Sequence, residues 1–173
     1  MGPKEAHSIN RTSCVAWFFV LCGAVLITTA TANPYWRGRT EQHEGIFQRC
    51  IKDKCNSIKV FSGEDKELDV IRIMLVIGLG YIVLAMFLGI LSVASSAYVA
   101  VLKCLAVIHI TISLSIYTFA FVNGSMTLLW CFYTAWGGVG LYFIGLVLLS
   151  SKILLSRQTK EEDSGIIENL YAQ

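Results

Sequence analysis

Charged residues are scarce in this chain, and three long stretches contain none. Only 15% of the 173 residues are charged, whereas 55% are hydrophobic. The uncharged stretches are residues 14–32, 73–102 and 104–151. A soluble domain of this size has no interior large enough to hold so much apolar sequence. The composition therefore excludes a soluble globular protein and indicates an integral membrane protein.

The lengths of these stretches predict four membrane-spanning helices. A helix rises about 1.5 Å per residue, so about 20 apolar residues cross the hydrocarbon core of a bilayer. The first stretch fits one span, the second fits one span plus a short connection at 92–97, and the third fits two. The third stretch breaks at 123–125, where the sequence NGS favours a turn. We expect a membrane domain at 1–155, with spans at about 14–32, 71–92, 99–121 and 128–151.

The first apolar stretch has a second interpretation, as a secretory signal peptide. Lys4 and Arg11 precede it, and the residues ATA at 30–32 have the form of a cleavage site. Against cleavage, the apolar stretch is long and the region before it is extended. Cleavage would leave three spans and an extracellular N-terminus, with the later topology unchanged.

Acidic residues are absent from the four predicted spans, so proton relays and cation-coupled transport have no obvious carrier. The sequence also shows no nucleophile–base set, phosphate-binding loop or cluster of metal ligands. We therefore expect a non-enzymatic protein with no cofactor, no metal, no nucleic-acid partner and no small-molecule substrate. Its expected partners are the lipid bilayer and either itself or another membrane protein, contacted through the helix faces and the long loop.

His109 is the one histidine in the predicted spans, and Ser113 lies one turn further on the same helix face. Hydrogen bonding between helices is the common role of such residues in lipid. The alternative is a ligand-binding or pH-sensing histidine, for which the sequence shows no partner. His109 and Ser113 are therefore a possible polar site within the membrane.

Cys14 and Cys104 lie near the predicted cytosolic ends of their spans, where reversible palmitoylation is plausible. Buried, unreactive thiols are the alternative. The glycines of WGGVGLYFIG in the fourth span permit close approach of another helix. Packing within the bundle is the more common use of such glycines, and lateral association is the other.

The segment 33–69 joins the first two spans and contains Cys50 and Cys55. A pair at this spacing could hold a metal, act as a redox couple or form a disulfide. The positive-inside rule does not orient the chain, because the side with the termini has six Lys and Arg residues and the loop has seven. A disulfide needs an oxidising compartment, and a zinc site would need two more ligands where the loop offers only His43. We therefore expect an extracellular loop with a Cys50–Cys55 disulfide, and cytosolic termini.

The loop also has the pattern of a β-hairpin between Gly45 and Ser62. Residues 51–54 suit a four-residue turn, after which Cys55 begins a return strand where Ile58 and Val60 alternate with polar residues. The disulfide would cross this turn. The seven bases of the loop are balanced by seven acids, four of which cluster at its end, at 64, 65, 67 and 69. These charges form either an ordinary solvated surface or a dipolar surface that meets a partner.

These features together resemble the superfamily of claudins, peripheral myelin protein and epithelial membrane proteins. The matching residues are Pro34 and Trp36 after the first span, the run Gly45, Ile46 and Phe47 before Cys50 and Cys55, and Arg72 at the mouth of the second span. The short cysteine spacing is closest to the branch of the lens fibre membrane protein. Phe47 stands where the family usually has Trp, and the second loop is nearly absent.

The resemblance implies an all-α membrane fold, a left-handed bundle of four helices capped by a small extracellular β-sheet in the first loop. Trp36, Phe47 and the disulfide would anchor this sheet on the bilayer surface, and aromatic residues do concentrate at that interface. The resemblance implies a multi-pass plasma-membrane protein that organises cell–cell contacts through its loop. An auxiliary subunit of a channel, receptor or other membrane complex is the alternative. The short second loop and the C-terminus LYAQ, which lacks the hydrophobic end residue that PDZ domains bind, differ from true claudins.

The last segment, 156–173, is polar, and we expect a disordered cytosolic tail. Its final residues, ENLYAQ, resemble the remnant of a protease-recognition site, so no function is assigned to them. A glycosylation sequon begins at Asn123, but so tight a loop would hold it close to the membrane.

Overall fold

The computed structural model describes the backbone of residues 3–39, 41–52, 54–58, 66–91, 96–121 and 126–171. Side chains are described for 14–39, 41–52, 54–58, 66–89, 98–121 and 126–151. The expected turn at 123–125, its sequon, Val60 and the connection after Leu91 lie outside these residues.

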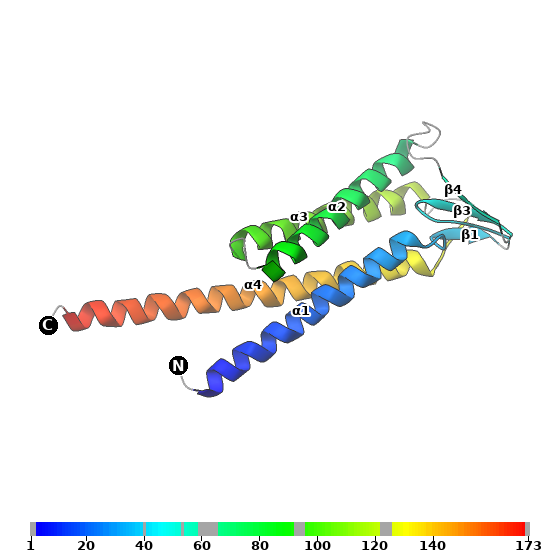
Figure 1. Cartoon of the computed structure of the whole chain (residues 1–173). Helices are drawn as coiled ribbons and strands as arrows, with labels where there is room; N and C mark the ends of the chain where they lie inside the picture. Colours follow the sequence, from blue (N-terminus) through cyan, green and yellow to red (C-terminus); the bar gives the residue numbers. More distant parts are fainter. Residues whose placement is uncertain are drawn as a thin grey trace.

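Four long apolar helices confirm the predicted fold class. They are α1 (Pro3–Ala32), α2 (Lys66–Leu91), α3 (Ser96–Phe121) and α4 (Trp130–Tyr171). Each contains a segment long and apolar enough to cross a membrane: Cys14–Ala32, Lys66–Gly89, Tyr98–Phe121 and Trp130–Ser151. The sheet lies at one end of these helices, and both termini lie at the other end (Figure 1). The chain is therefore a multi-pass membrane protein.

α2 begins at Lys66, five residues before the predicted boundary. Glu67 and Asp69 lie in its first turn, where the positive end of the helix dipole favours acidic side chains. The expectation that the spans contain no acid is therefore wrong for the first turn of α2, although it holds for the predicted span 71–92.

The tail is the second difference. We expected disorder over 156–173, but α4 continues without a break as far as Tyr171. Between residues 152 and 162 the chain is rich in Lys, Leu, Arg, Gln and Glu, which have good intrinsic helix propensity. A polar composition therefore does not by itself indicate loss of the helix.

A five-stranded antiparallel sheet covers one end of the helices, with the order β4-β3-β2-β1-β5. Its strands are β1 (Arg37–Arg39), β2 (Gln42–Glu44), β3 (Gln48–Ile51), β4 (Lys54–Ser57) and β5 (Thr127–Leu128). Four strands come from the first loop, and β5 comes from the connection between α3 and α4. β5 pairs with β1, so that Arg37 lies opposite Leu128. The nearly absent second loop thus contributes a strand, which is why α4 begins at Trp130 and not at 128.

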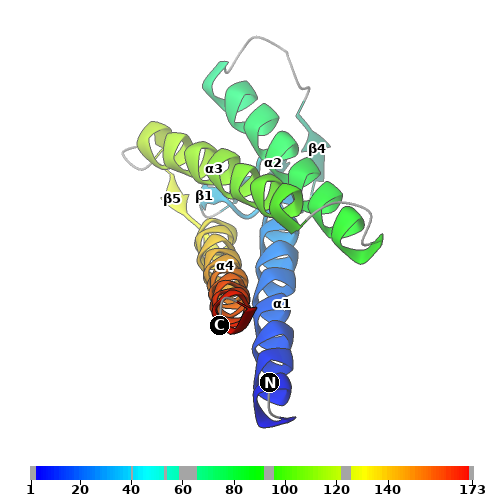
Figure 2. The same ribbon diagram turned by 90° about the vertical axis from the view of Figure 1, so that its left-hand side faces the viewer.

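The helices associate mainly as two pairs, α1 with α4 and α2 with α3. Figures 1 and 2 both show α2 beside α3. Glycines bring α1 and α4 together, because a Cβ atom at Gly23 would lie 2.6 Å from the carbonyl oxygen of Gly138. At Gly145 a Cβ would lie 2.9 Å from the carbonyl oxygen of Ala16. Gly23 of α1 and Gly145 of α4 therefore serve packing within the bundle, as small residues commonly do in membranes.

Candidate functional site: the sheet and its attachment to the helices

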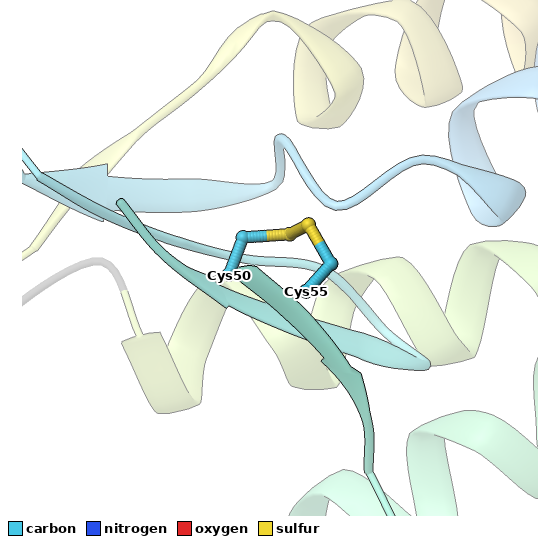
Figure 3. The surroundings of a disulfide bond; sticks show 2 residues. All are labelled: Cys50 and Cys55. Carbon is cyan, nitrogen blue, oxygen red and sulfur yellow. A yellow bond between two sulfur atoms is a disulfide. The ribbon is translucent and has the colours of Figure 1, made fainter. Parts of the chain in front are cut away.

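The predicted hairpin is present as β3 and β4, and the Cys50–Cys55 disulfide joins them (Figure 3). The two cysteines are directly opposite each other in the ladder. Lys52 in the turn has a positive φ of 53°. The return strand begins at Lys54, one residue before the predicted start, and ends at Ser57. The disulfide closes a very short loop, which in the chain-entropy estimate is worth roughly 2 kcal/mol.

Gly45 and Pro34 meet directly at the base of the sheet. A Cβ atom on Gly45 would lie 2.6 Å from the Cα of Pro34 and 2.5 Å from the carbonyl oxygen of Asn33. Only glycine leaves room for this contact. The next two residues, Ile46 and Phe47, pack into the hydrophobic core. Ile46 is fully buried, and Phe47 is partly buried against the same core. The segment that resembles the family motif therefore attaches the sheet to the helices.

Trp36 corrects one expectation. It was expected to lie at the bilayer surface, but its side chain is 0% exposed. The indole Nε1 donates a hydrogen bond of 2.7 Å to the carbonyl oxygen of Ala30 at the end of α1. The ring also packs edge-on against Tyr117 of α3, with 5.1 Å between centroids. Trp36 therefore fixes the sheet to two helices, and the protein itself surrounds it.

Backbone hydrogen bonds around Trp36 join the two loops. Its amide donates to the carbonyl of Glu44 at 3.3 Å, and its carbonyl accepts from the amide of Leu129 at 2.8 Å. The amide of Cys131, in the first turn of α4, donates to the carbonyl of Tyr35 at 3.2 Å. A residue of the first loop thus bonds directly to the start of the fourth helix.

Arg72 attaches the sheet to α2. Its guanidinium is 2% exposed, and Nε donates a 2.7 Å hydrogen bond to the carbonyl oxygen of Ile46. Nη1 forms an ion pair of 2.7 Å with Asp69, one turn earlier on the same helix. Its Nη2 is buried and makes no hydrogen bond with any described residue. A buried charge of this kind is stabilised only through such paired contacts.

Glu44 lies between two arginines on neighbouring strands. Its Oε2 accepts from Arg37 and its Oε1 from Arg49, each at 2.8 Å. Glu44 itself is buried, whereas the Arg49 side chain is 54% exposed. The guanidinium of Arg37 also lies 3.9 Å from the ring centroid of Phe121, at the end of α3. The triad links β1, β2 and β3, and Arg37 sets β1 against the end of α3.

His43 lies opposite Cys50, and the potential ligand atoms of His43, Cys50 and Cys55 lie within 4.8 Å of one another. Both sulfur atoms are joined in the disulfide, so only the imidazole could ligate a metal in this state. The His43 ring stacks on Tyr35, with 4.5 Å between centroids. The stacked rings of Tyr35 and His43 therefore lie beside the disulfide.

His109 and Ser113, the possible polar site within the membrane, have different partners. The Ser113 hydroxyl donates a 3.0 Å hydrogen bond to the carbonyl of Ile71 and thereby ties α3 to α2. The Nδ1 of His109 lies 2.8 Å from the carbonyl oxygen of Leu105 in its own helix, and the ring contacts Tyr81 edge-on. Ser113 makes the interhelical bond expected of hydroxyl residues in lipid.

The thiols of Cys14 and Cys104 are both exposed on the helix surfaces. The alternative of buried, unreactive thiols is therefore wrong for these two residues. Their palmitoylation stays a prediction.

Sequence reasoning did not find Glu44, Tyr117 or β5. Glu44 is the last residue of the short polar run QHE, which has no strand signal, and Tyr117 is one of many apolar residues in its span. Comparison with known protein families and with curated proteins finds no match for this chain in either. Fold and site together define a four-span membrane protein with a disulfide-stapled sheet.

Proposed function

We propose that this protein is claudin-like and organises contacts between membranes through its sheet. In this proposal the chain is non-enzymatic and lies in the plasma membrane. The sheet faces the cell exterior, and both termini face the cytosol. The disulfide supports this orientation, because such bonds persist in oxidising compartments.

One observation carries the proposal: the sheet is fixed at its base and exposed at its far strand. Trp36 and Arg72 hold it to the helices through buried contacts. By contrast, every residue of β4 is exposed, and Ile51 at the end of β3 is 49% exposed. A surface that is held rigidly loses little conformational freedom when it binds, which favours recognition.

The resemblance supports the same reading. The residues that carry it, Pro34, Trp36, Gly45 and Arg72, are the ones that form the joint between sheet and helices. These residues explain why the sheet is fixed to the helices, as the resemblance to claudins implies. The choice of partner would then depend on the exposed side chains of β3 and β4.

Contact formation can be tested in cells that lack junctions. We would express the protein with a cytosolic fluorescent tag and mix expressing with bare cells. The proposal predicts enrichment where two expressing cells touch and none where an expressing cell meets a bare one. A uniform signal at both kinds of border would contradict self-recognition between cells.

A second candidate function, that of an auxiliary subunit, is favoured by outward-facing glycines. Among the described residues, no atom lies within 4 Å of a Cβ built on Gly80 of α2 or on Gly137 of α4. Such open glycines let another helix approach closely in the membrane. If this function is correct, Gly80→Leu or Gly137→Leu would abolish a crosslinked complex in cells, while Val83→Leu on an exposed helix face would leave it intact. An unchanged complex in both glycine variants would exclude these faces.

A further inference from the structure

Lys103 is a buried cation within a membrane-spanning helix. It is 4% exposed, and its ammonium lies 4.0 Å from the ring centroid of Trp17 on α1. Among the described side chains, no acid forms an ion pair with it. A cation–π contact offsets only part of the cost of removing an ammonium from water. The site is therefore electrostatically incomplete without an anion.

An apolar groove lies on the surface between α3 and α4, and its lining on α3 begins at Val107, one helical turn after Lys103. It has a volume of about 550 Å³. It is lined by residues that include Val107, Ile108 and Thr111 of α3 and Trp136, Gly140 and Phe143 of α4. Lys103, Val107 and Thr111 are spaced at intervals of four residues, so they lie along one face of α3. Lys103 thus stands one turn beyond the groove, toward the end of α3 that is away from the sheet.

The charge of Lys103 and the position of the groove within the membrane together indicate the chemical class of the ligand. The groove lies within the spanning segments, where the surrounding medium consists of acyl chains. The lysine is within about 8 Å of the start of the span at Tyr98, a distance that a lysine side chain and a lipid headgroup can bridge together. An anionic phospholipid could place one acyl chain in the groove and its phosphate near the ammonium.

We propose that Lys103 and the α3–α4 groove form a binding site for an anionic phospholipid of the leaflet opposite the sheet. With the sheet outside the cell, this is the cytosolic leaflet, which is rich in such lipids. The headgroup supplies the missing counter-charge, and the acyl chain fills the groove. The site does not depend on the contact function proposed above.

Two glycines of α4 provide a matched test of the groove. A Cβ on Gly140 or on Gly137 would meet no atom of the described residues within 4 Å, so neither backbone position excludes a side chain. Only Gly140 lines the groove. Gly140→Leu should therefore fill the acyl-chain site, whereas Gly137→Leu should leave it open.

The experiment is native mass spectrometry of the purified full chain, with palmitoyl-oleoyl phosphatidylserine competing against the phosphatidylcholine of the same chains. We expect at least tenfold preferential retention of phosphatidylserine. Lys103→Met and Gly140→Leu should each abolish the preference, while Lys103→Arg and Gly137→Leu should preserve it. Lys152→Gln controls for cytosolic-side lysines in general and should have no effect.

Equal retention of the two lipids by the unaltered protein would overturn the proposal. So would a preference for phosphatidylserine that survives both Lys103→Met and Gly140→Leu, because binding would then lie elsewhere. A dimer whose mass is lost specifically in Gly140→Leu would show that a second copy occupies the groove, and would also overturn it. Thermal unfolding of each variant in lipid-free detergent identifies any that fails to fold. For such a variant, Lys103→Gln or Gly140→Val takes its place.

Discussion

The guanidinium Nε of Arg72 donates a 2.7 Å hydrogen bond to the backbone carbonyl of Ile46, which connects the second helix to the base of the sheet. The two residues are 26 positions apart in sequence. Ile46 is fully buried, so its carbonyl has no solvent to replace the bond. This contact explains why a cation stands at the sheet end of α2, directly before the long apolar run of that helix.

Replacing Arg72 should strongly destabilise the protein. Arg72→Met removes the bond to Ile46 and leaves Asp69 without its ion pair, so we expect a loss of about 3–5 kcal/mol in the free energy of unfolding. The measurement is equilibrium unfolding in bicelles. Adding Asp69→Asn to Arg72→Met should recover part of the loss. Lys54→Met, on an exposed strand, is the control, and an equal loss in that variant would refute the assignment.

Trp36→Phe should separate the hydrogen bond of Trp36 from its aromatic packing. Phenylalanine keeps a ring near Tyr117 but cannot donate to the carbonyl of Ala30, and it leaves part of the indole volume empty. We expect a loss of about 2 kcal/mol or more, seen as a lower thermal midpoint. Trp130→Phe alters a 53% exposed indole and should change stability by no more than about 0.5 kcal/mol. Similar effects of both substitutions would place the importance of Trp36 at the membrane surface instead.

The two arginines that bind Glu44 should differ in their contribution. The Arg37 side chain is 16% exposed and also packs on Phe121, whereas that of Arg49 is 54% exposed. Arg37→Gln should cost several times more stability than Arg49→Gln, for which we expect about 1 kcal/mol or less. High salt should weaken only the contribution of Arg49, because water screens exposed pairs. Equal losses, both sensitive to salt, would show that the triad acts as an ordinary surface network.

Removing the disulfide should loosen the outer hairpin and leave the helices in place. The double variant Cys50→Ser, Cys55→Ser loses roughly 2 kcal/mol of loop-closure stabilisation. Hydrogen exchange should rise at β3 and β4 and stay unchanged in the spans. Cys14→Ser and Cys104→Ser are controls, since both thiols are free and exposed. Faster exchange throughout the helices would mean that the hairpin holds the bundle together.

The four helices could be predicted from sequence because their signal is long. An uncharged run of about 20 residues has few explanations other than a membrane span. The boundaries were less certain, since Glu67 and Asp69 look like loop residues until the helix dipole at the start of α2 is considered.

Most of the sheet could not be predicted. β1 and β2 have the sequences RGR and QHE, which contain no apolar alternation, and β5 has only two residues. These strands form because tertiary contacts with Trp36 and Glu44 hold them, and local propensity does not report such contacts. The hairpin of β3 and β4 was found because its cysteines marked it.

The burial of Trp36 could not be read from its position either. A tryptophan next to a span usually marks the membrane interface. Its partners, Ala30 and Tyr117, come from two different helices, and only the folded arrangement brings them to the same place. For the same reason the sequence did not predict that Lys103, one of the six Lys and Arg residues counted on the side of the termini, is buried beside Trp17.

The most direct measurement of the central claim places a glycan on the exposed strand. Ile58→Thr creates a sequon at Asn56, whose side chain is exposed on β4. The account predicts a mass shift removed by deglycosylation, which shows that the sheet is outside, together with loss of enrichment at contacts between expressing cells. Adding Asn56→Gln should remove the glycan and restore the enrichment. Contacts that persist with the glycan in place, or a sequon at Asn56 that is never modified, would contradict the account.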